Sequence, residues 1–164
     1  MSKNMHTCIA THVTSTYRAN CVYVLCPECR KAKNKREDNV NDVGKLIAFF
    51  AEMKAANPKF FLDIQIDDQK SIKNIFWANA SSRAAYEDFG DCMTFDTTYR
   101  TNIYNMPLGV FVGVNHHLQS TIFACALIRD ESEDSFLWLW RTFLKCMKGK
   151  QPTIILTGMQ KISY

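Results

Sequence analysis

The fold is decided by DCMTFDTTYR, MPLGVFVGVNHH and QSTIFACALI, which occupy residues 91–100, 106–117 and 119–128. Each segment contains a short apolar run bounded by polar or turn-forming residues, which is typical of a strand. A helix that begins with a capping box at Asp130 and Glu133 is predicted next. Its apolar side chains recur at helical spacing, and they are Phe136, Leu139, Trp140, Phe143, Leu144 and Met147.

TIILT, at residues 153–157, predicts a fourth short strand after this helix. The order strand, strand, strand, helix, strand is that of the opening half of a ribonuclease-H-like α/β fold. Strands joined through a crossover helix pair in parallel with a right-handed connection, so we expect the fourth strand beside the first. That pairing would place Gly158 close to Asp96. The helix over 132–147 should cover one face of the sheet with its apolar stripe.

A helix, a hairpin and a second, short helix are predicted over residues 42–90, ahead of this core. Apolar residues recur at helical spacing from Val43 until Asn57-Pro58 stops the run. Two segments with interspersed apolar residues, 58–67 and 71–79, then indicate the strands of a hairpin.

The short helix is expected from about Ala80 to Phe89, with Gly90 as its C-terminal cap. We expect the two helices of this lead-in to cover the second face of the sheet. The strand at 153–157 would then form an open edge, because nothing predicted in this chain pairs beyond it. Open edges favour association and marginal stability.

Asp96 is the candidate catalytic residue of the predicted first strand. In a ribonuclease-H-like fold, an acid on this strand and an acid just after the fourth strand are neighbours. They can share two divalent metals about 3.5–4 Å apart, which clamp the attacking and leaving oxygens in phosphoryl transfer. The alternative is a structural aspartate that accepts hydrogen bonds from the backbone of the following TTY, and this is the commoner role of a single Asp.

FWAN, SRAAY, TFDTTYRTN, FVGVNHH and DSFLWLW follow one another between residues 76 and 140. With these motifs, the chain from about Asp42 to Thr157 resembles the Mutator-like (MULE) transposase domain of the plant far-red-impaired-response family. The resemblance implies a domesticated transposase that acts as a nuclear regulator of transcription. Full-length members of the family carry an N-terminal zinc-finger DNA-binding domain, this central domain and a C-terminal SWIM-type zinc finger.

The resemblance places Asp96 at the first catalytic-type aspartate of the family. After the fourth strand the family pattern resembles T-D-Q-D, whereas this chain has Thr157-Gly158-Met159-Gln160. Gly158 therefore stands at the second acid and has no side chain that could bind a metal. The third acid would lie on a later helix, beyond Tyr164. One carboxylate cannot hold two Mg²⁺ ions, so we expect no enzyme, and Mg²⁺ only where such a site is intact.

His116 and His117 resemble an active-site pair. Neighbouring residues of a strand point to opposite faces, however, so both cannot enter one site without a bulge. The resemblance instead places them as structural residues at the end of the second strand.

Residues 1–41 carry the net charge of the chain, because seven of its 20 basic residues but only three of its 16 acids lie there. We predict a poorly ordered basic segment. Its cluster of cations indicates either weak contacts with DNA phosphates together with nuclear import, or a solvated linker; the cluster comprises Arg30, Lys31, Lys33, Lys35 and Arg36. The resemblance favours a nuclear location.

Cys26 and Cys29 have the C-x2-C spacing of half a zinc site. No second pair at regular spacing accompanies them, and ordinary reduced thiols are the alternative. Zinc is expected in full-length relatives, and for this chain both alternatives stay open.

The sequence leaves three functions. The favoured one is a catalytically inactive, nuclear, DNA-binding regulator derived from a transposase. The others are a truncated Mg²⁺- or Mn²⁺-dependent transposase nuclease, and a gene fragment without independent function. The expected partners are DNA, through the basic segment 1–41, and full-length family members that cover the exposed half-sheet. We expect no membrane span, since no run of about 18 apolar residues occurs. The chain thus divides into 1–41, the lead-in 42–90 and the core 91–164.

Overall fold

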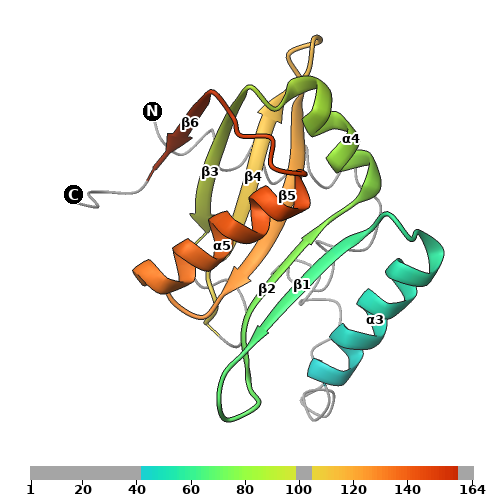
Figure 1. Ribbon diagram of the computed structural model, residues 1–164, viewed down its shortest axis with the longest axis vertical. Coiled ribbons are helices and arrows are strands. Elements are labelled where there is room, and N and C mark those ends of the chain that lie inside the picture. Colours follow the sequence, from blue (N-terminus) through green and yellow to red (C-terminus); the bar gives the residue numbers. More distant parts are fainter. Residues whose placement is uncertain (1–41, 99–104, 159–164) are drawn as a thin grey trace, which may run out of the picture. The chain divides into compact units, whose positions relative to one another are not determined.

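The computed structural model describes residues 42–98 and 105–158, which lie in one compact unit of the chain. Its elements occur in the predicted order (Figure 1). They are α3 (Asp42–Ala56), β1 (Phe61–Ile66), β2 (Ile72–Ala78), α4 (Ala80–Phe89), β3 (Cys92–Thr98), β4 (Leu108–Val114), β5 (Ser120–Ile128), α5 (Glu133–Cys146) and β6 (Ile154–Thr157).

The six strands form one mixed sheet in the order β1-β2-β5-β4-β3-β6. All neighbouring strands are antiparallel except β3 and β6, which are parallel, with Phe95 beside Thr157. The chain reaches β6 through α5, which crosses from β5 past β4 and β3. This topology confirms the predicted α/β architecture of an incomplete ribonuclease-H-like fold.

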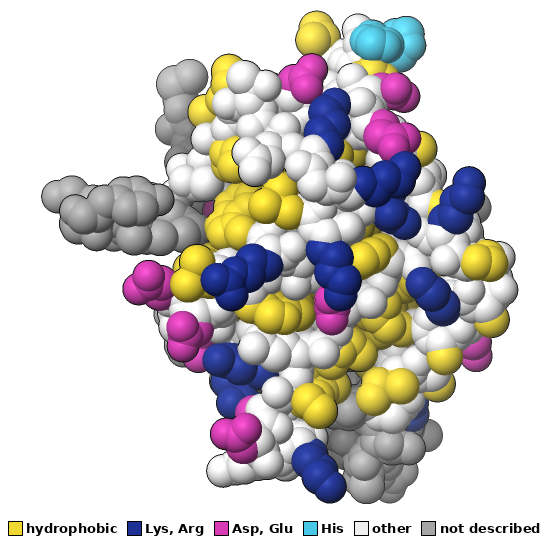
Figure 2. All heavy atoms as spheres, in the orientation of Figure 1, with side chains coloured by type: hydrophobic (Ala, Val, Ile, Leu, Met, Phe, Trp, Pro, Cys, Tyr) yellow, Lys and Arg dark blue, Asp and Glu magenta, His cyan; other side chains and the backbone are white. Residues whose placement is uncertain are grey.

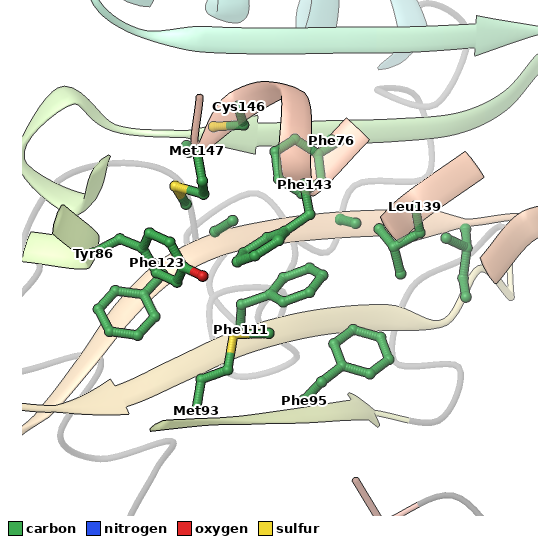
Figure 3. Packing of buried hydrophobic residues seen from close by; sticks show 14 of the residues in the cluster. Phe76, Tyr86, Met93, Phe95, Phe111, Phe123, Leu139, Phe143, Cys146 and Met147 are labelled. Atoms are coloured by element: carbon green, nitrogen blue, oxygen red, sulfur yellow. The ribbon is translucent and has the colours of Figure 1, made fainter. Parts of the chain in front are cut away.

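One face of the sheet carries an aromatic core under both α4 and α5 (Figure 3). Phe143 of α5 stacks on Phe111 of β4 with 4.5 Å between the ring centroids. Tyr86 of α4 contacts the Phe143 ring at 5.2 Å and the Phe123 ring at 5.1 Å. The predicted stripe of α5 faces this core, with Phe136, Leu139, Phe143 and Met147 buried and Trp140 and Leu144 packed against it.

The second face is covered by α3 at the β2 end. Phe76 points into the α5 core, so the next residue, Trp77, points to the opposite side. There the Trp77 ring packs against Phe50 of α3 with centroids 5.5 Å apart. The expectation that both lead-in helices cover this face was wrong for α4, because Tyr86 finds its aromatic partners on the α5 side.

The caps of two helices differ from the prediction, one in the residue that forms the cap and one in its backbone conformation. Ser132, not Asp130, is the N-cap of α5, and its Oγ accepts from the Ser135 backbone N–H. Asp130 lies two residues earlier and accepts hydrogen bonds from the hydroxyls of both serines.

Gly90 does cap α4, but with φ −78°, so it is not in the left-handed conformation. Glycine fits there because an added Cβ would lie 2.4 Å from the Tyr86 carbonyl oxygen.

Candidate functional site

Asp96 lies on the open face of β3. Its neighbour Phe95 points into the core and is 1% exposed, so strand alternation turns Asp96 the other way. The Asp96 side chain is exposed. Within residues 42–98 and 105–158 the Asp96 carboxylate has no hydrogen-bond or ion-pair partner, including the backbone of Thr97 and Thr98. The structural alternative also involves the backbone of Tyr99, which lies outside the described residues, so both interpretations of Asp96 stay predictions.

Gly158 lies beside Asp96, as the topology predicts. The parallel register sets Thr157 against Phe95, which carries the next residue of β6 to the level of Asp96. A Cβ added at Gly158 would lie 3.4 Å from Asp96 Oδ1. An aspartate at position 158 would therefore set two carboxylates side by side, whereas glycine contributes no ligand atom from a side chain.

The described residues do not fit the metal pair that such a fold implies. Glu131 lies near the same end of β3, where its Oε1 accepts a hydrogen bond of 2.7 Å from Thr97 Oγ1. Thr97 alternates with Asp96, however, so this contact belongs to the other side of the strand. No three His, Cys, Asp or Glu side chains of the described residues are grouped as metal ligands. One free carboxylate does not provide the shared oxygens that two divalent ions require.

His116 and His117 lie in the turn between β4 and β5, not at the end of a strand as predicted. The His116 ring packs edge-on against Phe89 with centroids 4.5 Å apart. The His117 backbone N–H donates to Asn115 Oδ1 at 2.9 Å, so the asparagine organises this turn. Val110 is the β4 residue opposite Asp96, and β4 runs four residues further before the turn begins. The histidines are thus remote from Asp96.

The remaining predicted site residues lie outside the described residues. They are the zinc candidates Cys26 and Cys29 and the basic cluster of Arg30, Lys31, Lys33, Lys35 and Arg36. Zinc binding and DNA contact at these positions stay predictions. Among the cysteines that are described, Cys146 is buried, and burial raises the pKa of its thiol to about 12. Cys146 is therefore a core residue and not a nucleophile.

The apolar surroundings of Asp96 were missed by the sequence interpretation, which considered only the acids. Val110 and Val112 of β4 share its face and are half-buried, while Leu156 of β6 is 57% exposed. The alternation of side chains along β4 and β6 could have predicted these neighbours, because it assigns them to the face of Asp96.

Comparison with known proteins identifies the family of the chain. Residues 92–162 match the family model "MULE transposase domain". The chain is 44% identical over 116 residues to "Protein FAR-RED IMPAIRED RESPONSE 1" of Arabidopsis thaliana, covering 71% of this chain and 14% of that protein. It is 40% identical over 132 residues to "Protein FAR1-RELATED SEQUENCE 5" of the same plant, covering 79% of this chain and 17% of that protein.

No solved structure is significantly similar to the chain. In the described residues no helix has both the length and the apolarity to cross a bilayer. The chain spans about one-sixth of the length of the curated relatives it matches. Through this region it belongs to the MULE transposase family, in the form carried by the far-red-impaired-response proteins of Arabidopsis thaliana.

Proposed function

We propose that the chain is a transposase-derived module that acts on DNA in the nucleus as a regulator of transcription, without metal-dependent catalysis. The observation that carries this proposal is Gly158 beside Asp96. A two-metal nuclease needs a carboxylate at both positions. Loss of one acid removes the chemistry and leaves the scaffold intact, because position 158 lies on the open face, away from the aromatic core.

The face of the domain that carries α5 supports a DNA contact outside the transposase body (Figure 2). On the α5 side, Lys and Arg are interspersed with apolar and acidic side chains (Figure 2). Several of these cations are paired, for example Lys145 with Asp63 at 2.9 Å and Lys148 with Glu87 at 2.6 Å. Paired, dispersed charges attract a polyanion less than a segment with a net excess of cations does. The excess of cations in residues 1–41 is therefore the better candidate for phosphate contact.

Restoring the second acid tests the catalytic half of the proposal. In calorimetric titration with Mn²⁺, we expect no saturable binding by the unchanged chain. Gly158→Asp should bind Mn²⁺, and its melting temperature should rise with Mn²⁺ concentration, because ligands that bind only the folded state stabilise it. Gly158→Asn is the matched neutral control, and Asp96→Ala in the Gly158→Asp background should abolish the gain. Nicking of supercoiled DNA by the unchanged chain that disappears in Asp96→Ala would refute the proposal.

Neutralising the basic cluster tests the DNA half. Replacement of Arg30, Lys31, Lys33, Lys35 and Arg36 by Ala in the full chain should weaken binding to duplex DNA irrespective of its sequence. The slope of log K against log salt should become shallower by up to about 4.5, since each of five phosphate contacts contributes roughly 0.9. The control replaces Lys145 and Lys148, which are paired in the transposase body. A larger loss in the control would place the DNA contact on the body instead.

A further inference from the structure

The link between α5 and β6 determines where residue 158 lies. β6 has four residues and contributes no side chain to the aromatic core, so its register beside β3 depends on how its start is held. The N–H groups of Thr153 and Ile154 both donate to the Asp91 carbonyl oxygen, at 2.8 and 2.9 Å. Asp91 comes directly before β3. One carbonyl therefore fixes the start of β6 relative to the start of β3, and this places Gly158 beside Asp96.

The last turn of α4 also holds this link. The Tyr86 hydroxyl donates to the Lys150 carbonyl oxygen at 3.2 Å, and the Lys150 ammonium donates to the Glu87 carbonyl oxygen at 2.8 Å. The same ammonium lies 3.5 Å from an Asp91 carboxylate oxygen and 5.9 Å from the centre of the Tyr86 ring. Two adjacent residues of α4 thus hold both the backbone and the side chain of Lys150.

Burial makes the Tyr86 bond the stronger of these contacts. The Tyr86 side chain is 1% exposed, and its ring packs against Phe123 and Phe143 (Figure 3). Burial, with the negative charge of Asp91 as a smaller cause, raises the pKa of Tyr86 to about 12, so the hydroxyl keeps the proton that it donates. The Lys150 ammonium is partly exposed, and exposed ion pairs contribute little to stability. The Tyr86 hydroxyl is therefore the main contact between the core and the link.

We propose that Tyr86 and Lys150 are positioning residues, which hold the α5–β6 link so that residue 158 lies at the level of Asp96. The inference rests on the proposed function in one respect, because it takes positions 96 and 158 as the pair at which two carboxylates would bind a metal. Without the Tyr86 hydroxyl, the link should leave α4 more often, and β6 should separate from β3 more often. The Tyr86 ring should stay in place, because Tyr86→Phe removes only one oxygen atom from a packed core.

Amide hydrogen exchange, measured by NMR on the full chain, tests the position of β6 directly. Ile154 directs its N–H towards β3, and so does Leu156, because the direction alternates along a strand. A short strand opens locally at a low cost in free energy, so these amides exchange without unfolding of the whole domain. Tyr86→Phe should accelerate their exchange by about three- to tenfold, which is the loss expected for one buried hydrogen bond.

Phe50→Leu is the control for a purely structural role. Phe50 packs against Trp77 on the opposite face of the sheet, so its replacement should lower the stability of the domain without changing the local opening of β6. Exchange of the Ile154 and Leu156 amides should therefore stay within about twofold of the unchanged chain. An acceleration in Phe50→Leu as large as in Tyr86→Phe would overturn the proposal, as would unchanged exchange in Tyr86→Phe.

Lys150→Met provides a second test that leaves the core untouched. It removes the ammonium and keeps the backbone carbonyl that accepts from Tyr86, so exchange of the β6 amides should rise by a smaller factor, about two- to threefold. Lys145→Met is the matched control, since Lys145 lies on α5 and pairs with Asp63 of β1 rather than with α4. Equal exchange in Lys150→Met and Lys145→Met would overturn the assignment of Lys150.

Metal affinity connects the link with the site. In the Gly158→Asp background, two neighbouring carboxylates repel one another and favour separation of β6, so the fraction of paired β6 limits the affinity for Mn²⁺. Adding Tyr86→Phe should raise the Kd for Mn²⁺ by about two- to tenfold, whereas adding Phe50→Leu should leave it unchanged. Equal Mn²⁺ affinity with and without Tyr86→Phe would overturn the proposal. If Gly158→Asp bound no Mn²⁺ at all, the role given to Gly158 in the proposed function would fail, and the exchange rates would still decide the roles of Tyr86 and Lys150.

Discussion

The two faces of the sheet differ although the same strands build them. On the core face, Phe111, Phe123 and Phe143 are completely buried. On the opposite face, Asp96 is exposed and Val112 is half-buried. Alternation along β3 alone produces the contrast, because Phe95 and Asp96 are adjacent residues that point to opposite sides.

This difference separates the residues that stabilise the domain from the residues around Asp96. Apolar area removed from water provides most of the driving force for folding, and that area lies mainly under α4 and α5. Position 158 contributes no side chain to the core. A substitution at position 96 or 158 should therefore leave the domain folded, whereas a substitution in the core should destabilise it.

The largest expected effect comes from removing an aromatic ring on the core face. Phe143→Ala should lower the free energy of unfolding by about 3–5 kcal/mol, because the cavity is enclosed by rings that cannot close it fully. Val112→Ala, on the open face, should cost roughly 1 kcal/mol or less. Urea titration followed by tryptophan fluorescence measures both. Equal losses in the two variants would mean that the open face is covered in solution.

Two glycines, one on each face of the sheet, allow the two faces to be compared in a second way. An added Cβ at Gly113 would lie 2.2 Å from Phe123 Cζ, and Phe123 is completely buried. Gly113→Ala should therefore destabilise the domain by about 1–3 kcal/mol through overpacking. At Gly158 the nearest atom would be Asp96 Oδ1 at 3.4 Å, and Gly158→Ala should change stability by only about 0.5 kcal/mol in either direction. Thermal melting measures the stability of both variants. If Gly158→Ala lost as much stability as Gly113→Ala, position 158 could not lie outside the packed core.

The local elements could be predicted from the sequence because their signals are local. The period of α5 and the short apolar runs of β3 to β6 identify these elements, and the crossover rule places Gly158 beside Asp96. The face chosen by α4 could not be predicted, because both sides of the sheet offer apolar partners. Only the packing of Tyr86 against Phe123 and Phe143 decides it.

The turns and helix caps were less predictable, because more than one nearby residue is suited to each role. Ser132 and Asp130 are both good cap residues, and their spacing does not show which of them accepts the first backbone N–H. His116 follows the apolar run of β4 closely, but Asn115 begins a turn, because its Oδ1 accepts hydrogen bonds from the backbone N–H groups of His117 and Gln119. The zinc and DNA assignments depend on residues outside the described part of the chain, and they stay predictions.

An effect smaller than those of Phe143→Ala and Gly113→Ala is expected at the start of α5, the helix that covers the core face. Asp130 accepts hydrogen bonds from the hydroxyls of Ser132 and Ser135, and these bonds lower its pKa in the folded protein. A lowered folded-state pKa means that ionised Asp130 stabilises the fold above the unfolded pKa, which is about 3.9. That contribution is lost as the pH falls through the folded value. Because Asp130 is largely exposed, Asp130→Asn should cost only about 0.5–1 kcal/mol at pH 7.

Stability measured from pH 7 down to pH 2 should show the two proteins converging at the acid end. Asp134→Asn is the matched control, since it neutralises a charge in the first turn of the same helix. Both Asp130 and Asp134 interact with the helix dipole there, so the loss in Asp130→Asn beyond that of the control measures the two hydroxyl bonds. A pH-independent difference between Asp130→Asn and the unchanged chain would show that the ionised carboxylate does not act through these bonds.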